Sequence, residues 1–266
     1  MTIEELIEEL KEEVLRAFIL SQSLEPLAEK PGCTTRTVDS SPGTKLEYFI
    51  ISAVNSTWPV LELVDRIVEK RRQPDCIFDI AYHMQLRSNR NRHGGKVNYA
   101  QILMLIPIIT SQCLLFVEDK SPYDVGLILE RVGPSMRATT NKDVDYLQRF
   151  FDLSRTLSEE HHRRLGTTRP QRYPRFSGVY SNIMDATEAD DFSHTMMATE
   201  IQHGYPQCRD IFEDLCANPT VGIIKESEAI YDRLLPRLGR HDIVADCIVV
   251  GFYLSLIQSR SQILFP

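Results

Sequence analysis

Apolar residues recur every three or four positions along most of this chain, which is the spacing that places them on one face of an α-helix. Residues 2–20 show the pattern clearly, and Thr2 followed by Glu5 is the sequence of a capping box at a helix start. The apolar face of this segment comprises Ile3, Leu6, Ile7, Leu10, Val14, Leu15 and Phe18. The same spacing predicts further helices over residues 45–68, 74–87, 100–116, 121–132, 142–157, 191–216, 227–238 and 243–263.

Two of the predicted helices lack a polar face. Residues 101–108 are almost wholly apolar, so the helix over 100–116 has no side to show to water and is expected in the centre of the fold. The helix over 243–263 is apolar on most sides and is expected to be buried as well. No stretch shows the sustained alternation of a β-strand. We therefore predict an all-α fold of about ten helices, in a single domain over residues 1–266 around the buried apolar helix.

Proline marks the expected irregularities, because it donates no backbone hydrogen bond and kinks or breaks a helix when it lies inside one. We expect a kink or split at Trp58-Pro59 and another near Gly204 and Pro206. We also expect a helix that opens at Ser121-Pro122, with proline in its first turn.

Composition and charge narrow the classes of function. With 42% hydrophobic and 25% charged residues, the chain resembles an ordinary globular protein rather than a disordered or membrane-spanning one. The net charge of -7 argues against a general nucleic-acid binder, since such proteins present a basic surface. Any anionic ligand must therefore be held by a local basic site and not by the overall field of the protein.

Signal patterns and cysteine spacing predict a cytoplasmic protein. Residues 1–16 are acidic and amphipathic and lack the positive start of a signal peptide. The apolar run over 102–109 is too short to cross a bilayer, so we expect no membrane partner. The 6 cysteines form no C-x-x-C pair and no ligand-like spacing with histidine. We interpret them as reduced cysteines, without a disulfide frame or a zinc site.

A polar loop runs directly into the apolar helix and is a first candidate site. Unpaired N–H groups at a helix start attract anions, and Arg87 and Arg90 just upstream add positive charge. The loop is interpreted as a phosphate site at a buried helix N-terminus, or alternatively as a flexible loop whose two glycines only let the chain turn. The candidate ligands in this loop are Arg92, Gly94, Gly95, Lys96 and Asn98.

Signatures of several common chemistries are missing from the sequence. There is no P-loop, no dinucleotide fingerprint and no Ser-His-Asp ordering. His161 and His162 stand beside Glu159 and Glu160, but adjacent residues on a helix point apart. We therefore do not expect these four residues to share a metal ion.

A second candidate site lies in the long segment between the first two predicted helices. Glycine, proline, serine and threonine interrupt the helical period over residues 24–43, and so long a loop in a compact domain is usually functional or disordered. The sequence places here, in order, Glu25, Lys30-Pro31-Gly32, Arg36 and Asp39, followed by Phe49 and Ser52-Ala53. This order resembles the triphosphoribosyl-dephospho-CoA synthase family, especially its archaeal-type branch.

Later segments extend the resemblance. Residues 94–98, Gly-Gly-Lys-Val-Asn, are similar to the family's Gly-Gly-Asn-Thr-Asn motif, which also runs into an apolar helix, and Pro107 matches the proline of that helix. Residues 191–212 resemble the helix after the family's acidic loop, and residues 241–244 resemble its late Asp-(Ser/Thr)-Leu-Ile motif. The likeness therefore touches most of the chain in the family's order.

The resemblance implies an all-α transferase that uses ATP and dephospho-CoA. The family moves the triphosphoribosyl group of ATP onto the ribose 2′-hydroxyl of dephospho-CoA and releases adenine. That chemistry needs a cationic cradle, carboxylates that bind Mg²⁺ or take up the hydroxyl proton, and a site closed to water. The residues implied are Lys30, Arg36, Arg92, Gly94, Gly95, Lys96, Asn98 and Asp242 for phosphate or substrate binding, and Glu25 and Asp39 for catalysis and Mg²⁺.

Several positions depart from the family's pattern, and its glycine-rich loop after residues 142–157 is absent. The departures are Cys33 and Val38 in the first motif, Lys96 and Ala100 in the second, and Asp246-Cys247 after the late motif, where the family has an Arg-Lys pair. Two hypotheses follow: a transferase acting on dephospho-CoA or a related acceptor, and a non-catalytic paralogue that binds a nucleotide or a partner protein through the same cleft. Under both, we expect residues 25–39 and 92–98 to face each other across one cleft.

Overall fold

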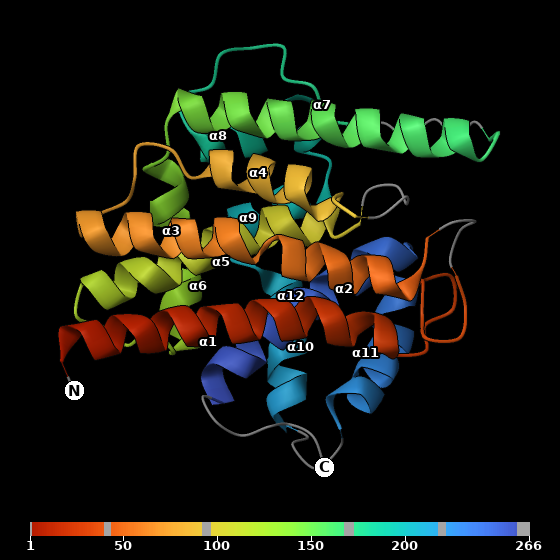
Figure 1. The fold of residues 1–266 in the computed structure, drawn as a ribbon, viewed down its shortest axis with the longest axis horizontal. Coiled ribbons are helices and arrows are strands. Elements are labelled where there is room, and N and C mark those ends of the chain that lie inside the picture. The colour runs from red at the N-terminus through yellow and green to blue at the C-terminus, as the bar shows by residue number, and fades with distance from the viewer. Residues whose placement is uncertain (1, 40–43, 92–96, 168–172, 218–221, 260–266) are drawn as a thin grey trace.

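The computed structural model describes residues 2–39, 44–91, 97–167, 173–217 and 222–259. Every regular element within these ranges is helical, which confirms the predicted all-α class (Figure 1). The α-helices are α1 (Ile3–Leu24), α2 (Leu46–Asn55), α3 (Thr57–Lys70), α4 (Phe78–Ser88), α5 (Tyr99–Val117), α6 (Val125–Arg137), α7 (Asn141–Arg164), α8 (Ile183–Thr187), α9 (Met196–His203), α10 (Pro206–Ala217), α11 (Ile223–Leu238) and α12 (His241–Ser259). Two 3₁₀ turns complete the described elements, η1 (Glu25–Leu27) and η2 (Asp190–Phe192).

Helix α5 is the buried centre of the fold, as its apolar sequence predicts. Nearly all of its side chains are buried, and it packs against α3, α4, α6 and α12. The Ser111 hydroxyl donates to the carbonyl of Pro107 within the helix, at 2.7 Å. The Tyr253 hydroxyl of α12 donates to Gln112 Oε1 of α5, also at 2.7 Å. These polar groups of α5 therefore bond inside the core instead of reaching solvent.

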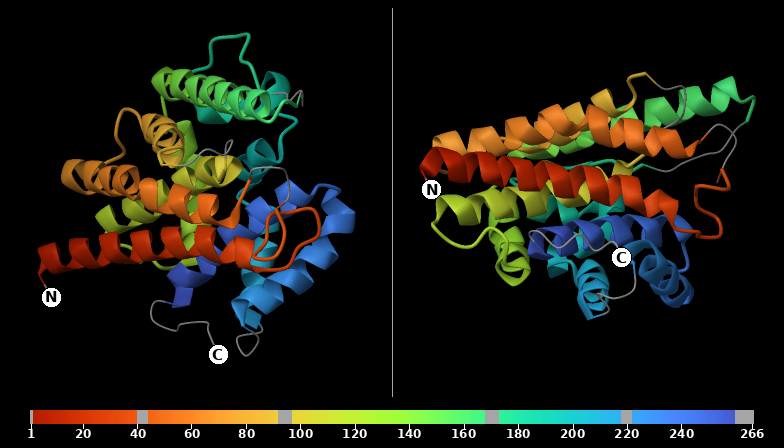
Figure 2. Two further views of the ribbon diagram at one scale, coloured as in Figure 1. Left: turned by 45° about the vertical axis from the view of Figure 1, so that its right-hand side comes forward. Right: turned by 60° about the horizontal axis from the view of Figure 1, so that its bottom comes forward.

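Helix α12 is the second buried helix. It packs against α1 on one side and against α10 and α11 on others (Figure 2). Both α5 and α12 are long and apolar enough to span a membrane on length and composition alone, a test that buried core helices also pass. The fold buries 89% of the most apolar stretch of α5 and 72% of the most apolar stretch of α12.

The predicted helix over 45–68 is two helices in the structure. The break falls at Ser56, between α2 and α3, where the Ser56 hydroxyl donates to the Ser52 carbonyl at 2.8 Å. Pro59 lies in the first turn of α3. Backbone N–H groups of a first turn make no hydrogen bond inside their helix, so proline is tolerated there. The chain therefore breaks just before the expected position and uses the proline inside a new helix start.

Two further boundaries are set by local geometry. The predicted segment over 191–216 divides into α9 and α10 at Gly204, whose φ of +70° ends α9. Helix α6 begins after Asp124 and not at Ser121, which corrects the predicted start. The reason is that the Asp124 carboxylate accepts a hydrogen bond from the Leu127 amide at 3.0 Å and so caps the helix at this later position.

Two buried carboxylates each cap the start of a helix other than their own. Asp143, in the first turn of α7, accepts hydrogen bonds from the backbone amides of Ile77 at 2.7 Å and Phe78 at 3.0 Å, at the start of α4. Its other oxygen accepts from the Thr140 amide at 2.9 Å. Glu200 of α9 caps the start of α10 in the same way, through two backbone amides. Each carboxylate satisfies N–H groups that have no partner inside their own helix.

The close approach of α10 and α12 depends on Gly251. A Cβ at this position would lie 3.0 Å from Cβ of Ile211 and closer still to its Cγ2. We expect Gly251→Ala to lower the free energy of unfolding by about 1–3 kcal/mol, the usual result of overpacking a core. Urea unfolding followed by circular dichroism measures the change.

The matched control for this prediction is Gly133→Ala in α6. A Cβ there would meet only the flexible end of Arg137, at 3.3 Å. Alanine is favoured over glycine inside a helix by about 0.5–1 kcal/mol, so this control should be slightly stabilised. If Gly251→Ala were stabilised to the same degree, the close packing of α10 on α12 would be contradicted.

Candidate functional site

The loop over residues 28–39, called the first loop below, lies at the end of the molecule where α5 and α12 begin (Figure 1). The Glu29 amide donates to Glu228 Oε1 of α11 at 2.8 Å. The Tyr231 hydroxyl of α11 donates to the Pro31 carbonyl, although the two residues are 200 positions apart in the sequence. The first loop is therefore fastened to the C-terminal part of the fold.

Glu25 and Lys30 form a buried ion pair beneath the Lys-Pro-Gly turn, residues 30–32. They are 3% and 2% exposed, and Lys30 Nζ lies 3.1 Å from Glu25 Oε1. The ammonium also donates to the carbonyl oxygens of Ala28, at 3.1 Å, and of Glu25. Burial raises the pKa of Glu25, while the charge of Lys30 lowers it. As placed, Lys30 holds the turn, because its buried ammonium is directed inward to the two carbonyl oxygens and to the Glu25 carboxylate.

Glu29 organises the exposed part of the first loop. Its carboxylate accepts hydrogen bonds from the Thr37 hydroxyl at 2.7 Å, the Thr35 hydroxyl at 3.0 Å and Arg36 Nε at 3.0 Å. The bond from Thr37 and those from Arg36 and Thr35 lower the pKa of Glu29. The Arg36 side chain is 60% exposed, and Asp39 is exposed as well. These two predicted site residues therefore lie where a ligand can reach them.

Asn98 connects the predicted second motif to α2. It has a φ of +57° immediately before α5, and its Nδ2 donates to the Phe49 carbonyl at 3.3 Å. Asn98 is buried, and its side-chain oxygen has no hydrogen-bond partner among the described residues. The other predicted ligands of this motif, which fall outside the described residues, are Arg92, Gly94, Gly95 and Lys96. Their anion contacts, and the cleft expected between residues 25–39 and 92–98, stay predictions.

Asp242 lies exposed in the first turn of α12 and is paired with Arg240. Its Oδ2 is 2.6 Å from Arg240 Nη2, and its Oδ1 accepts from Arg240 Nε at 3.2 Å. Asp242 raises the pKa of the arginine further above its ordinary value. Arg240 is therefore a cation next to a predicted phosphate-binding residue, although the family motif does not include it.

A tyrosine, a histidine and a glycine hold the Lys-Pro-Gly turn against α12. The Tyr231 hydroxyl contacts both the Pro31 carbonyl and His241 Nδ1. Gly32 has a φ of +82°, and a Cβ there would lie 2.9 Å from Cγ and Nδ1 of His241, so only glycine lets the turn lie on the imidazole. Cys33 Sγ lies 3.6 Å from the His241 carbonyl oxygen. Sequence reasoning missed Tyr231, because no local pattern connects it to a loop near the start of the chain.

The charge of Asp246 contributes to raised pKa values both in the first loop and at the start of α5. Burial raises the pKa of the Cys33 thiol to about 11, and the charges of Glu25 and Asp246 contribute to the rise. Burial also raises the pKa of Tyr99, the first residue of α5, and Tyr173 and Asp246 contribute. The first loop, α5 and α12 therefore meet within electrostatic reach of Asp246. This place is more acidic than the resemblance implies, since the family has a cation pair at that position.

Ligation of magnesium by Glu25 does not fit its placement, because the carboxylate faces Lys30 in the buried pair. In the part of the chain that the structure describes, no group of three or more His, Cys, Asp or Glu side chains is placed to hold a metal ion. Mg²⁺ commonly binds through substrate phosphates and only one or two carboxylates. The exposed Asp39 thus remains a predicted ligand for a magnesium ion that ATP would bring with it.

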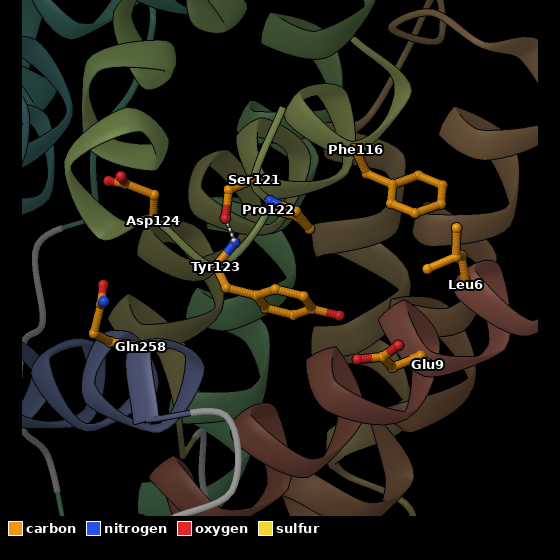
Figure 3. A pocket seen from close by; sticks show the side chains of 8 residues that line it. All are labelled: Leu6, Glu9, Phe116, Ser121, Pro122, Tyr123, Asp124 and Gln258. Carbon is orange, nitrogen blue, oxygen red and sulfur yellow. Dashed lines mark hydrogen bonds between the residues drawn. The ribbon is translucent and has the colours of Figure 1, made fainter. Parts of the chain in front are cut away.

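Two cavities lie away from these residues. One, of about 430 Å³, lies between the first turns of α1 and the ends of α5 and α12 (Figure 3). The Tyr123 ring extends across it toward Leu6 and Glu9. Its lining includes Glu9 and Asp124 but no lysine or arginine, which does not suit a triphosphate. The second, of about 320 Å³, lies between α10 and α11, and its two arginines are paired with aspartates.

Comparison with known proteins shows a shared fold. No family model matches this chain, and no curated protein matches it. A solved structure with a similar fold is the crystal structure of an Archaeoglobus fulgidus protein described as "putative triphosphoribosyl-dephospho-coA synthase". The match has a TM-score of 0.50 and 15% identity, and it covers 78% of this chain and 97% of that chain. The chain therefore has a fold like that of the archaeal protein, while membership of the family that its motifs resemble stays a prediction.

Proposed function

We propose that this chain is a transferase of the triphosphoribosyl-dephospho-CoA synthase type, which moves the triphosphoribosyl group of ATP onto dephospho-CoA or a related nucleotide acceptor. The observation that carries the proposal is the agreement of two separate likenesses. The motifs of the first loop and of the start of α5 resemble that family in their order. The helical fold, compared without reference to those motifs, is similar to that of a protein described by the same activity.

The proposed reaction is a displacement at the ribose of ATP. The acceptor hydroxyl oxygen bonds to the anomeric carbon C1′, and the bond from C1′ to N9 of adenine breaks with its electron pair on adenine. The hydroxyl loses one proton and adenine takes up one, so the reaction is balanced without a redox partner. The protein's part is to hold both nucleotides in line and to keep water from C1′.

Positive charge for the triphosphate is proposed to come from the exposed Arg36 and Arg240, together with Arg92 and Lys96. Arg36 and Arg240 are each paired with an exposed carboxylate, which a phosphate of higher charge can displace. Magnesium would enter with ATP. A cytoplasmic location would supply both nucleotides, and the overall negative charge of the chain still argues against a nucleic-acid partner.

Incubation of the full chain with ATP, Mg²⁺ and dephospho-CoA tests the proposal. We expect adenine to appear only when both nucleotides are present, in an amount equal to a product whose mass is that of dephospho-CoA plus the triphosphoribosyl group. Chromatography with mass detection measures both products. Release of ADP in place of adenine, or no release of adenine, would contradict the transferase.

A non-catalytic role is the second candidate, and the closed pair of Glu25 and Lys30 favours it. The ammonium is already satisfied inside the loop, and Asp246 brings a negative charge where the family has cations. Such a paralogue would bind a nucleotide or a partner protein through the same site. ATP binding by calorimetry without adenine release would support this function over the first.

Lys96→Ala should weaken ATP binding about tenfold, because we expect Lys96 to replace the amide of the family motif as a phosphate contact. One hydrogen bond to a charged group contributes roughly 1.5–3 kcal/mol. A change of 1.4 kcal/mol corresponds to about tenfold in affinity. Titration calorimetry at two ionic strengths measures the effect, with Lys70→Ala, an exposed lysine at the end of α3, as the control. A solvated lysine changes affinity far less, so equal affinities would place Lys96 outside the site.

A further inference from the structure

The partners of Tyr231 determine where the proton of His241 lies. The Tyr231 hydroxyl has one proton and contacts three groups: the Pro31 carbonyl oxygen, His241 Nδ1 and, at 3.9 Å, the Cys33 thiol, which donates to it. A carbonyl oxygen can only accept a hydrogen bond, so the hydroxyl proton is directed to Pro31. The tyrosine oxygen then accepts a hydrogen bond from His241, which puts the proton of the neutral imidazole on Nδ1. Nε2 is consequently left unprotonated, with a free lone pair.

The His241 side chain packs on the turn and is still exposed to solvent. A Cβ at Gly32 would lie nearest to Cγ, Nδ1 and Cδ2 of the ring, so Nε2 is not among the atoms that the turn approaches most closely. His241 is exposed, at the first position of α12. Among the described residues, Nδ1 has its partner in Tyr231 and Nε2 has none. The imidazole is thus held through Nδ1, and its Nε2 is available as a proton acceptor.

We infer that His241 is the general base of the proposed transferase, with Nε2 taking the proton of the attacking ribose hydroxyl; the inference rests on the proposed function. The O–H bond of the acceptor breaks as its oxygen bonds to C1′ of ATP. The C1′–N9 bond breaks with its electron pair leaving on adenine. The proton passes from Nε2 to solvent, and adenine takes up one proton from solvent. Tyr231 is a positioning residue, because it orients the imidazole and fixes its protonated nitrogen.

The neighbouring groups are less suited to accept this proton. Glu25, expected from the resemblance to act in catalysis, is bound to Lys30 inside the fold. The Cys33 thiol of the first loop keeps its proton, since burial raises its pKa to about 11. Asp242, on the same helix as His241, is occupied by Arg240. His241, in contrast, has both a lone pair without a partner among the described residues and an orientation fixed by Tyr231.

Nitrogen NMR of the full chain tests the pairing without requiring activity. Long-range proton–nitrogen spectra of ¹⁵N-labelled protein distinguish a proton on Nδ1 from one on Nε2. The signals of His241 are identified by their loss in His241→Gln. We expect the proton on Nδ1 in the wild type and on Nε2 in Tyr231→Phe, because a free neutral imidazole side chain prefers Nε2. A wild type with the proton on Nε2 overturns the inference.

Adenine release from ATP and dephospho-CoA tests the base itself. His241→Gln should lower kcat about 100-fold, the lower end of what general base catalysis contributes, with little change in KM for either nucleotide. Tyr231→Phe should lower kcat about tenfold, because the imidazole loses the partner that orients it. His203→Gln, an exposed histidine at the end of α9, is the matched control and should keep the wild-type kcat.

The outcomes distinguish a failure of this inference from a failure of the proposed function. An undiminished kcat in a folded His241→Gln overturns the base and leaves the transferase standing. A wild type that releases no adenine overturns both, whatever the nitrogen spectra show about the tautomer. A loss of kcat in His241→Gln together with the proton on Nδ1 in the wild type supports the inference. Circular dichroism of each variant confirms that it is folded.

Discussion

Lys30→Met is expected to lower the free energy of unfolding by about 3–5 kcal/mol, because it leaves the buried Glu25 carboxylate without its cation. Methionine is apolar, unbranched and adaptable in a core, so the loss reports the missing charge more than a cavity. The Ala28 carbonyl also loses the donor that lies 3.1 Å away. Urea unfolding followed by circular dichroism measures the change in free energy.

Two further variants make the result specific. The double variant Lys30→Met with Glu25→Gln should recover much of the loss, because a neutral amide needs no counter-charge in the core. Lys142→Met, at an exposed position of α7, should stay within about 0.5 kcal/mol of the wild type. A Lys30→Met protein as stable as this control would contradict the buried pair.

The loss in Lys30→Met should also grow with pH. Burial raises the pKa of Glu25 and Lys30 lowers it, so removal of Lys30 raises this pKa further. A carboxyl whose pKa is higher in the folded than in the unfolded state favours folding at low pH, where it is protonated in both states. That contribution disappears as the pH rises through the folded pKa. The difference in stability from the wild type should therefore be small near about pH 4 and largest near about pH 8.

Asp143→Ala should destabilise the protein by on the order of 4 kcal/mol, since one carboxylate accepts from three backbone amides, of Ile77, Phe78 and Thr140. The first two amides are buried at the start of α4, and no side chain of the N-cap residue Ile77 satisfies them. Removal of the carboxylate leaves them without an acceptor and without water. Urea unfolding gives the free energy, and hydrogen exchange should show lost protection at the amides of Ile77 and Phe78.

Asp145→Ala is the matched control for this prediction. Asp145 lies two positions further along α7 and is exposed. Its replacement should change stability by no more than about 0.5 kcal/mol, as is usual for surface positions. If the two variants unfolded at the same urea concentration, the role of Asp143 as a cap for α4 would be contradicted.

The parts of the fold that could be predicted from the sequence are those that depend on near neighbours. The capping box of α1 is one example: the Thr2 amide donates to Glu5 Oε2 at 2.7 Å, three residues away. The burial of α5 is another, because a helix that is apolar on all sides has no stable place except the core. The start of α4 is different, since its cap is the Asp143 side chain of α7, and no pattern around residue 77 shows that.

The candidate site likewise has features that the sequence predicts and features that depend on distant residues. The motifs identify the first loop as a charged, structured segment, but they do not show which way Lys30 points. Its direction is decided by the Glu25 carboxylate and by the carbonyl of Ala28, which draw the ammonium inward. Tyr231 illustrates the other limit, because its bond to Pro31 joins residues 200 positions apart. The sequence thus supplies the kinds of group at the site, and the fold determines their partners.

The packing of α1 on α12 joins the first of the described helices to the last. Arg16 of α1 donates to the Leu256 carbonyl of α12 at 3.1 Å, across 240 positions of sequence. A ribosome adds about 5–20 residues per second, so α1 exists for on the order of tens of seconds before α12 emerges to cover it. During that time part of its apolar face is open to chaperones or to other chains. Pauses in translation ahead of α12 should therefore favour aggregation of this protein more than pauses ahead of helices that pack only on their sequence neighbours.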